Sequence, residues 1–230
     1  MAPGFLLVTS EPGPDVTLDE FQDWYNNEHV PLRLEHLPSF LAGARFRAAD
    51  ALAPTWLAVY DIDDTAAFAH ESYTRLRASR SAREAALVGR LALLDRRTYV
   101  LRGDSGEGAT SSYAAGGGGG GKAPTPVVLT QWTDTAPGDP SAWKEKGASG
   151  WVRTRTYECI DSLRSGRSVA PGPEAQRIPR YLVVHELCDL MAAEDPALKA
   201  TSAQSEESRL WALYRAYPSI AQRNPSVTEA

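Results

Sequence analysis

The chain has 230 residues, of which 43% are hydrophobic and 23% are charged, and its net charge is -5. This length suits one large domain or two small ones, and the acidic balance argues against nucleic-acid binding, which usually needs a basic face. No apolar run is long enough to span a bilayer, and the N-terminus lacks the positive region of a signal peptide. Cys159 and Cys188 are expected to be free thiols. We therefore expect a cytoplasmic protein that binds a small molecule and neither nucleic acid nor a membrane.

The first hundred residues predict strands and helices in the order βαββαβ. Thr17 and Glu20 have the spacing of a capping box, so a helix is predicted from there to about residue 32, where Pro31 disturbs it. A long helix is predicted over 66–94, with a possible break near 79–81. Strands rich in aromatic and branched side chains are predicted at residues 5–9, 40–48, 55–62 and 97–101.

The rest of the chain weakly repeats this order after a glycine-rich stretch. Six consecutive glycines at 116–121 predict a flexible linker. Beyond it, a Ser-, Gly- and Pro-rich insertion is predicted at 162–178, and no fourth strand is predicted after residue 218. Strands are predicted at residues 127–132, 151–157 and 181–187, with helices at 139–147 and 206–217.

The order of elements predicts an α+β fold of two ferredoxin-like βαββαβ halves that pair into a barrel. A ferredoxin-like sheet carries helices on one face only, so its other face must be covered, and the second half can cover it. The expected divisions are a first half at 1–105, a linker at 106–125, a degenerate second half at 126–222 and a frayed tail at 223–230. The chain is then either a monomer with a pseudo-dimeric barrel or, if an edge stays open, a homodimer.

The predicted first helix carries the strongest candidate for chemistry. Leu18, Phe21, Tyr25, His29 and Leu32 recur at helical spacing, which places His29 on the inward stripe beside Tyr25. An imidazole with a pKa near neutrality can accept or donate a proton. By residue type alone, a core histidine bonded to a carbonyl is the more common outcome.

The segment at 21–32, with the sequence FQDWYNNEHVPL, resembles the first helix of the dimeric α+β-barrel superfamily, and of its EthD-like branch in particular. The resemblance covers residues 5–101 well and the second half only in strand order. It implies a catalytic histidine in this helix, and so favours a catalytic His29. The superfamily includes cofactor-free cyclases, isomerases, decarboxylases, dehydratases and small monooxygenases, many of which act on aromatic polyketides or lactones, and also haem proteins.

The predicted active site combines this helix with the strand at 55–62. His29 is the expected acid or base, and Tyr25 and Tyr60 are expected to stabilise an oxyanion, although both tyrosines also suit a packed core. The expected substrate-binding residues are Trp24, Asn27, Glu28, Trp56 and His185. The four histidines show no zinc-site spacing, so no metal is expected.

The expected function is His-mediated proton transfer on a small aromatic or polyketide-like secondary metabolite. The reaction would be that of a lyase, isomerase or cyclase, such as a cyclisation, dehydration or decarboxylation, and no cofactor is expected. Two alternatives stay open. One is a haem-dependent or cofactor-free oxygenase on the same fold, and the other is a non-catalytic ligand-binding module.

Overall fold

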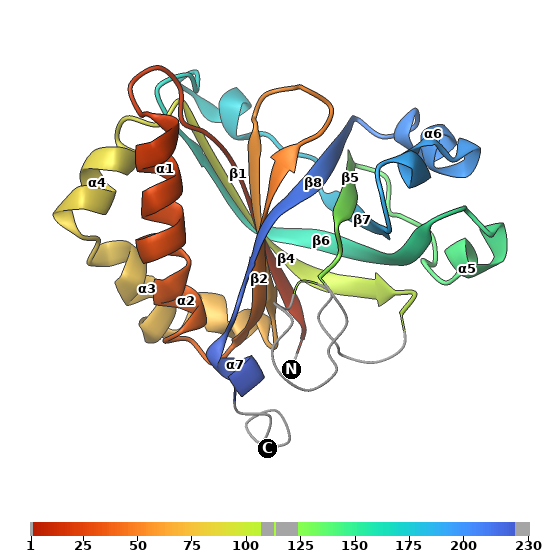
Figure 1. The fold of residues 1–230 in the computed structure, drawn as a ribbon, viewed down its shortest axis with the longest axis horizontal. Coiled ribbons are helices and arrows are strands. Elements are labelled where there is room, and N and C mark those ends of the chain that lie inside the picture. Colours follow the sequence, from red (N-terminus) through yellow and green to blue (C-terminus); the bar gives the residue numbers. More distant parts are fainter. Residues whose placement is uncertain (1, 107–112, 114–123, 224–230) are drawn as a thin grey trace.

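The strand-forming stretches build one closed sheet. The computed structural model describes residues 2–106, 113 and 124–223, and its eight strands form an antiparallel barrel in the order β1-β3-β2-β8-β5-β7-β6-β4 (Figure 1). All seven predicted strands are present. The strands are β1 (Gly4–Glu11), β2 (Phe40–Ala48), β3 (Trp56–Ile62), β4 (Leu93–Asp104), β5 (Val127–Thr133), β6 (Trp151–Ser165), β7 (Tyr181–Leu187) and β8 (Glu207–Tyr217).

Two runs of four strands make up the ring. Strands β4-β1-β3-β2 are consecutive, and so are β8-β5-β7-β6, while the pairs β2·β8 and β4·β6 join the two runs. Every pairing in the barrel is antiparallel. The barrel is therefore closed by this chain alone.

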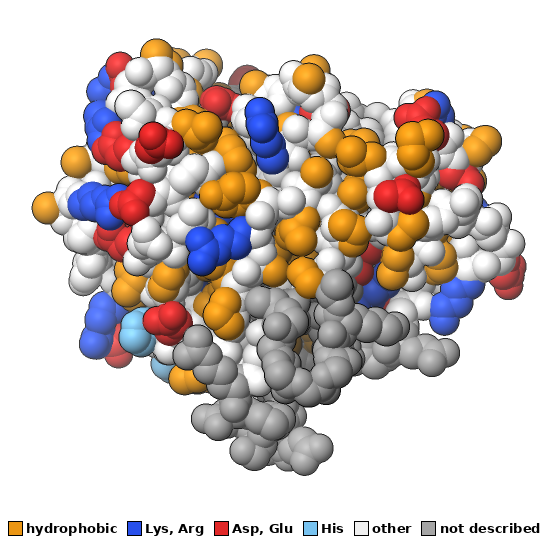
Figure 2. All heavy atoms as spheres, viewed as in Figure 1, with side chains coloured by type: hydrophobic (Ala, Val, Ile, Leu, Met, Phe, Trp, Pro, Cys, Tyr) orange, Lys and Arg blue, Asp and Glu red, His pale blue; other side chains and the backbone are white. Residues whose placement is uncertain are grey.

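Short helices cover opposite sides of the barrel. Helices α1 to α4 lie on one side, and α5 and α6 lie on the other (Figure 1). Over α1 to α4, acidic and basic side chains are intermingled (Figure 2). Within the described residues, no helix is long and apolar enough to cross a membrane. The helices are α1 (Leu18–Trp24), α2 (Pro31–Leu34), α3 (Glu71–Ala78), α4 (Ala82–Val88), α5 (Ala142–Lys146), α6 (Pro196–Ser202) and α7 (Ile220–Arg223).

The alternation of side chains along each strand separates the barrel interior from the two helical layers. All eight strands contribute to one apolar cluster, which includes Trp132 and Trp211 and fills the barrel. On β3, Leu57 and Val59 belong to this interior, whereas Trp56, Ala58, Tyr60 and Ile62 pack under α1 to α4. The predicted shared face of these last four residues is confirmed. A third cluster lies between the strands of the second run and α5 and α6.

The predicted closing helix at 206–217 is wrong, because this stretch is strand β8. Its leucines, alanines and arginines are good helix formers. However, Arg209 and Trp211 are buried on alternate positions, as a strand requires, and β8 pairs with β2 on one side and β5 on the other. The expectation that the second half lacks a fourth strand is wrong for the same reason.

Two other boundaries also differ from the prediction. The single helix expected at 66–94 is a 3-10 turn at Thr65–Phe68 followed by α3 and α4, and β4 begins at Leu93. The break expected near 79–81 is confirmed, since the Ser81 side chain caps α4. The insertion expected at 162–178 begins inside β6, which continues to Ser165.

Buried charges and one linker residue join the two runs of strands inside the barrel. The Arg155 guanidinium on β6 lies 2.7 Å from Asp61 on β3 and 2.9 Å from Glu186 on β7, and all three side chains are buried. Tyr113 is fully buried beside them, with its ring centroid 4.9 Å from Arg155. The other residues of the predicted linker at 107–112 and 114–123 lie outside the described residues.

Candidate active site

The helix that carries His29 changes its winding just before that residue. Thr17 caps α1 by accepting a hydrogen bond from the Glu20 N–H at 3.2 Å, as predicted. After α1, residues Tyr25–His29 form a π-helical turn in which the Val30 N–H donates to the Tyr25 carbonyl at 3.1 Å. Pro31 has no N–H to continue the normal ladder. The wide turn leaves both Tyr25 and His29 buried under the helix, and such turns are frequent at functional sites.

His29 is paired with a carboxylate from a distant helix. Its Nδ1 lies 2.8 Å from Oε1 of Glu84 on α4, and both side chains are buried. Burial and the nearby Arg33 charge lower the pKa of His29 to about 4. Burial alone would raise the pKa of Glu84, but the His29 hydrogen bond and neighbouring positive charges outweigh it and lower that pKa. At neutral pH a neutral imidazole therefore donates its Nδ1–H to an ionised carboxylate.

This arrangement leaves Nε2 of His29 as the nitrogen with a lone pair. Nε2 makes no hydrogen bond to any described residue, and the side chain keeps 11% of its exposure. The backbone carbonyl of His29 also accepts a hydrogen bond from Arg33 at 2.6 Å, which holds the turn in place. The imidazole is thus held at Nδ1 by Glu84, its backbone is held by Arg33, and the lone pair of Nε2 is available.

Several polar atoms in the layer between α1 and the sheet are buried without a partner in the described residues. They include the Tyr60 hydroxyl, the Trp24 indole N–H and two nitrogens of Arg45. The Ser10 hydroxyl lies near enough to Tyr25 to lower the pKa of that tyrosine, although the two hydroxyls are not in hydrogen-bonding geometry. Buried polar groups are nearly always satisfied in folded proteins. Their concentration between α1 and the sheet is the pattern expected of a site that a polar ligand or water completes.

The two tyrosines keep their protons at neutral pH. Burial raises the pKa of Tyr25 and of Tyr60, against the opposing charges of Arg45 and Arg33. The Arg45 guanidinium lies 4.1 Å from the centre of the Tyr25 ring, and it donates to Asn26 at 3.1 Å. Both hydroxyls therefore have a hydrogen that they can donate, and the Arg45 guanidinium packs against the ring of Tyr25.

A cavity of about 370 Å³ opens at the end of this layer. Phe40, His70 and Tyr73 are among its lining residues. The Phe40 ring also packs edge-on against Tyr60, with 5.6 Å between the ring centroids. Phe40 therefore both lines this cavity and contacts the ring of Tyr60.

The structure brings together five of the eight predicted site residues. Trp24, Tyr25, Trp56 and Tyr60 share the apolar layer under α1, and the His29 ring lies 4.6 Å from that of Trp24 and 5.1 Å from that of Tyr25.

The other three predicted residues lie elsewhere. Asn27 is exposed and donates to Asp23 at 2.6 Å. Glu28 points outward toward Ser81 at the start of α4. His185 lies on β7 beneath α5, on the other side of the barrel.

Sequence reasoning missed Glu84 and Arg33, the two charged partners of His29. Glu84 stands 55 residues from His29, and only the packing of α4 against the π-helical turn joins them. Arg33 is also buried, although it follows directly after Pro31. The described residues contain no group of three or more potential metal ligands.

Comparisons with known proteins bear on the fold. No protein-family model matches the sequence, and no curated protein is significantly similar to it. Among solved structures, an anthrone oxidase-like protein has a TM-score of 0.57 at 10% identity, over 96% of this chain and 94% of the other. A "putative monooxygenase" from Fusobacterium nucleatum has a TM-score of 0.45 at 9% identity, over 94% of each chain. The chain thus has the fold of the anthrone oxidase-like protein.

Proposed function

We propose that this protein is a cofactor-free enzyme in which the His29–Glu84 pair removes a proton from a small aromatic or polyketide-like substrate that then reacts with O₂. The observation that carries the proposal is a neutral, buried imidazole, held at Nδ1 by an ionised carboxylate, with Nε2 unpartnered in the described residues. A carboxylate in this position fixes the tautomer and stabilises the imidazolium that forms when Nε2 takes a proton.

The buried tyrosine hydroxyls would stabilise the negative charge that forms when the proton is removed. Removing a C–H proton from a carbon conjugated with a carbonyl places negative charge on the carbonyl oxygen, and donors aimed at that oxygen lower the barrier. Tyr25 and Tyr60 keep their protons and have hydrogens to donate, with Arg45 behind Tyr25. The layer between α1 and the sheet thus combines a base with oxyanion donors.

The fold shared with the anthrone oxidase-like protein supports anthrone as the first substrate to test. His29 would take a proton from the methylene carbon, and O₂ would add to the resulting anion to give a peroxide that His29 protonates. Loss of the second methylene proton then breaks the O–O bond. One O₂ is consumed, and one carbonyl and one water are formed.

We expect the purified protein to convert anthrone to anthraquinone with one O₂ consumed per product. An oxygen electrode and liquid chromatography measure the two quantities, and a blank without protein corrects for spontaneous oxidation. Conversion of a polyketide-like substrate in the absence of O₂ would instead indicate a cyclisation, dehydration or decarboxylation by the same base. No turnover beyond the blank with either kind of substrate would contradict the proposal and favour a ligand-binding module.

A haem enzyme is the competing candidate, because a histidine held at Nδ1 by a carboxylate is also a good iron ligand. Protein expressed with haem supply distinguishes the two. The proposal expects activity without a Soret absorbance band and no loss of activity after treatment with a chelator. Activity found only in haem-loaded protein would overturn the cofactor-free reaction.

We also infer that the two runs of strands are ferredoxin-like halves and that the working unit is a monomer. The same strand order in both runs supports this, as does the matching register of Tyr60 opposite Leu6 and His185 opposite Leu129. We expect light scattering after gel filtration to give the mass of one chain, 24.9 kDa. A stable mass of twice that value, independent of concentration, would contradict the inference.

A further inference from the structure

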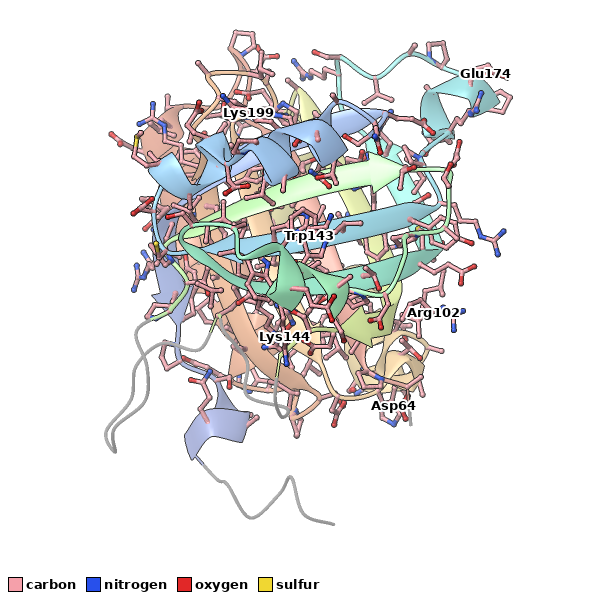
Figure 3. The ribbon with its side chains drawn as sticks, turned by 90° about the vertical axis from the view of Figure 1, so that its right-hand side faces the viewer. Asp64, Arg102, Trp143, Lys144, Glu174 and Lys199 are labelled. Atoms are coloured by element: carbon pink, nitrogen blue, oxygen red, sulfur yellow. The ribbon has the colours of Figure 1, made fainter. Side chains whose placement is uncertain are left out.

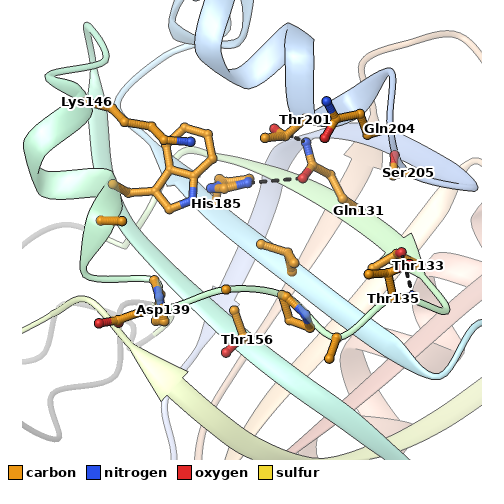
Figure 4. A pocket seen from close by; sticks show the side chains of 17 residues that line it. Gln131, Thr133, Thr135, Asp139, Lys146, Thr156, His185, Thr201, Gln204 and Ser205 are labelled. Carbon is orange, nitrogen blue, oxygen red and sulfur yellow. Dashed lines mark hydrogen bonds between the residues drawn. The ribbon is translucent and has the colours of Figure 1, made fainter.

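A cleft on the opposite side of the barrel has no part in the proposed reaction. It has a volume of about 440 Å³ and lies over β5, β6 and β7, between α5, α6 and the loop at 135–140 (Figures 3 and 4). This volume is within the range of small-molecule sites. Helix α5 has only five residues, so it covers less of its sheet than α1 and α2 cover of theirs.

Uncharged polar side chains make up a large part of the walls of this cleft. Hydroxyl and amide groups reach it from β5, β6, α6 and the turn that follows α6 (Figure 4). An accidental gap over a sheet would be lined mainly by the apolar side chains that the missing helix should cover. The uncharged polar lining residues are Gln131, Thr133, Thr135, Thr156, Thr201, Gln204 and Ser205, and the loop at 135–140 adds the carboxylate of Asp139.

His185 forms the floor of the cleft as part of an ordered chain of hydrogen bonds. The Thr201 hydroxyl donates to a carbonyl of α6, so it accepts from the Gln131 amide at 3.1 Å and directs the amide oxygen toward His185. Nε2–H of His185 then donates to that oxygen at 3.3 Å, and Nδ1 accepts from Thr154 at 2.7 Å. The 3.3 Å bond is long, so a ligand oxygen could replace Gln131 as the acceptor.

One positive charge at the cleft has no negative partner in the described residues. The Lys146 ammonium lies 3.9 Å from the centre of the Trp143 ring, and no described carboxylate is within 4.0 Å of it. Trp143 packs edge-on against His185, with 4.5 Å between the rings. Burial and then the Lys146 charge lower the pKa of His185 to about 3. Lys146 is therefore the only cationic residue that lines the cleft, and it is available to a ligand.

We propose that this cleft is a second ligand site that binds a small organic carboxylate, with Lys146 beside the carboxylate and the hydroxyl and amide side chains bonded to its other oxygens. Trp143 provides the aromatic wall against which the body of the ligand lies, next to His185 on the floor of the cleft. The site is independent of the reaction proposed at His29, and its occupancy does not require that reaction.

The test is calorimetric titration with two matched probes, hydroxynaphthoate and the corresponding hydroxynaphthamide, which differ in charge. We expect saturable binding of the carboxylate and roughly tenfold weaker binding of the amide, a difference of about 1.4 kcal/mol. Lys146→Met should reduce carboxylate binding to the level of the amide. Lys144→Met is the matched control, because Lys144 is an exposed lysine of the same helix that does not line the cleft, and it should leave both affinities unchanged.

Two further measurements locate the binding. Gln204→Leu should weaken both probes, since it removes an amide from the lining. His29→Gln should weaken neither, which separates this site from the candidate active site. Absence of saturable binding by the wild-type protein at millimolar hydroxynaphthoate, or equal losses in Lys146→Met and Lys144→Met, would overturn the proposal. Loss of binding in His29→Gln would mean that the probe occupies the first site instead.

Discussion

Replacing His29 by Gln should lower kcat by about 10²- to 10⁴-fold, the usual contribution of one positioned proton-transfer group. Glutamine can still donate an amide hydrogen to Glu84, so the burial of the pair is preserved while the base is lost. Initial rates of anthrone oxidation measure the effect, and thermal unfolding confirms that the variant is folded. A folded variant with unchanged kcat would remove His29 from the mechanism.

The pH dependence of kcat/KM gives a second, sharper form of this prediction. An unperturbed histidine titrates near 6.5, but the pKa of His29 is lowered to about 4 by burial and by Arg33. The basic form is the neutral imidazole, so it predominates above about pH 4. We therefore expect kcat/KM to be constant from pH 6 to pH 8 and to fall toward about pH 4. A fall centred near 6.5 would mean that the imidazole is solvated rather than buried.

Glu84→Gln should reduce kcat. It should not move the acid-side fall in kcat/KM to higher pH. Glu84 raises the pKa of His29, so its removal shifts that pKa further down, and the remaining loss of rate reflects the lost orientation and charge. Glu35→Gln is the control, because Glu35 is exposed at the end of α2 and has no contact with His29. Equal effects of the two substitutions would contradict a positioning role for Glu84.

Arg155→Met should strongly destabilise the barrel. It removes the guanidinium that lies between Asp61 and Glu186 and leaves two carboxylates buried near each other. Breaking a buried ion pair from one side typically costs about 3–5 kcal/mol, a large part of the 5–15 kcal/mol by which a typical protein is stable. Urea unfolding followed by circular dichroism measures the loss.

A variant in which all three charged residues are replaced together keeps this test informative if Arg155→Met does not fold. Arg155→Met with Asp61→Leu and Glu186→Leu should recover much of the stability, because no uncompensated charge is left. Arg75→Met is the control, since its pair with Glu71 is exposed, and it should cause no measurable change. If Arg155→Met loses no more stability than the control, then the buried ion pairs of Arg155 with Asp61 and Glu186 do not hold the two runs of strands together.

The sequence predicted those parts of the fold that depend on residues close to one another in the chain. Trp56 to Ile62 alternate between two buried faces and have strong strand propensity, so β3 was found within one residue of its true start. The cap at Thr17 was found for a similar reason, since a hydroxyl and its target N–H lie within one turn. Strand β8 was missed because its composition favours a helix, and only the pairing with β2 and β5 makes it a strand.

The candidate site was predictable only in its first helix. The inward positions of Tyr25 and His29 follow from helical spacing, although the π-helical turn between them does not. The pairing of His29 with Glu84 depends on how α4 packs, and nothing near either residue signals it. His185 was predicted to bind substrate with the residues around His29, yet it lies on β7 beneath α5, on the opposite side of the closed barrel.

Closure of the ring also limits how this protein can meet other proteins. Strand β8 pairs with β2 and β5, and β4 pairs with β1 and β6, so every strand of the described barrel has a neighbouring strand on both sides. Unpaired backbone is confined to strand ends that extend past a neighbour, such as residues 160–165 of β6 beyond its pairing with β7. An extended peptide therefore finds no full-length edge strand to pair with, and such pairing is a common mode of recognition and also a common route to aggregation. We expect a partner of the barrel to bind mainly through side chains, on the helical layers, in the cleft or at the loops.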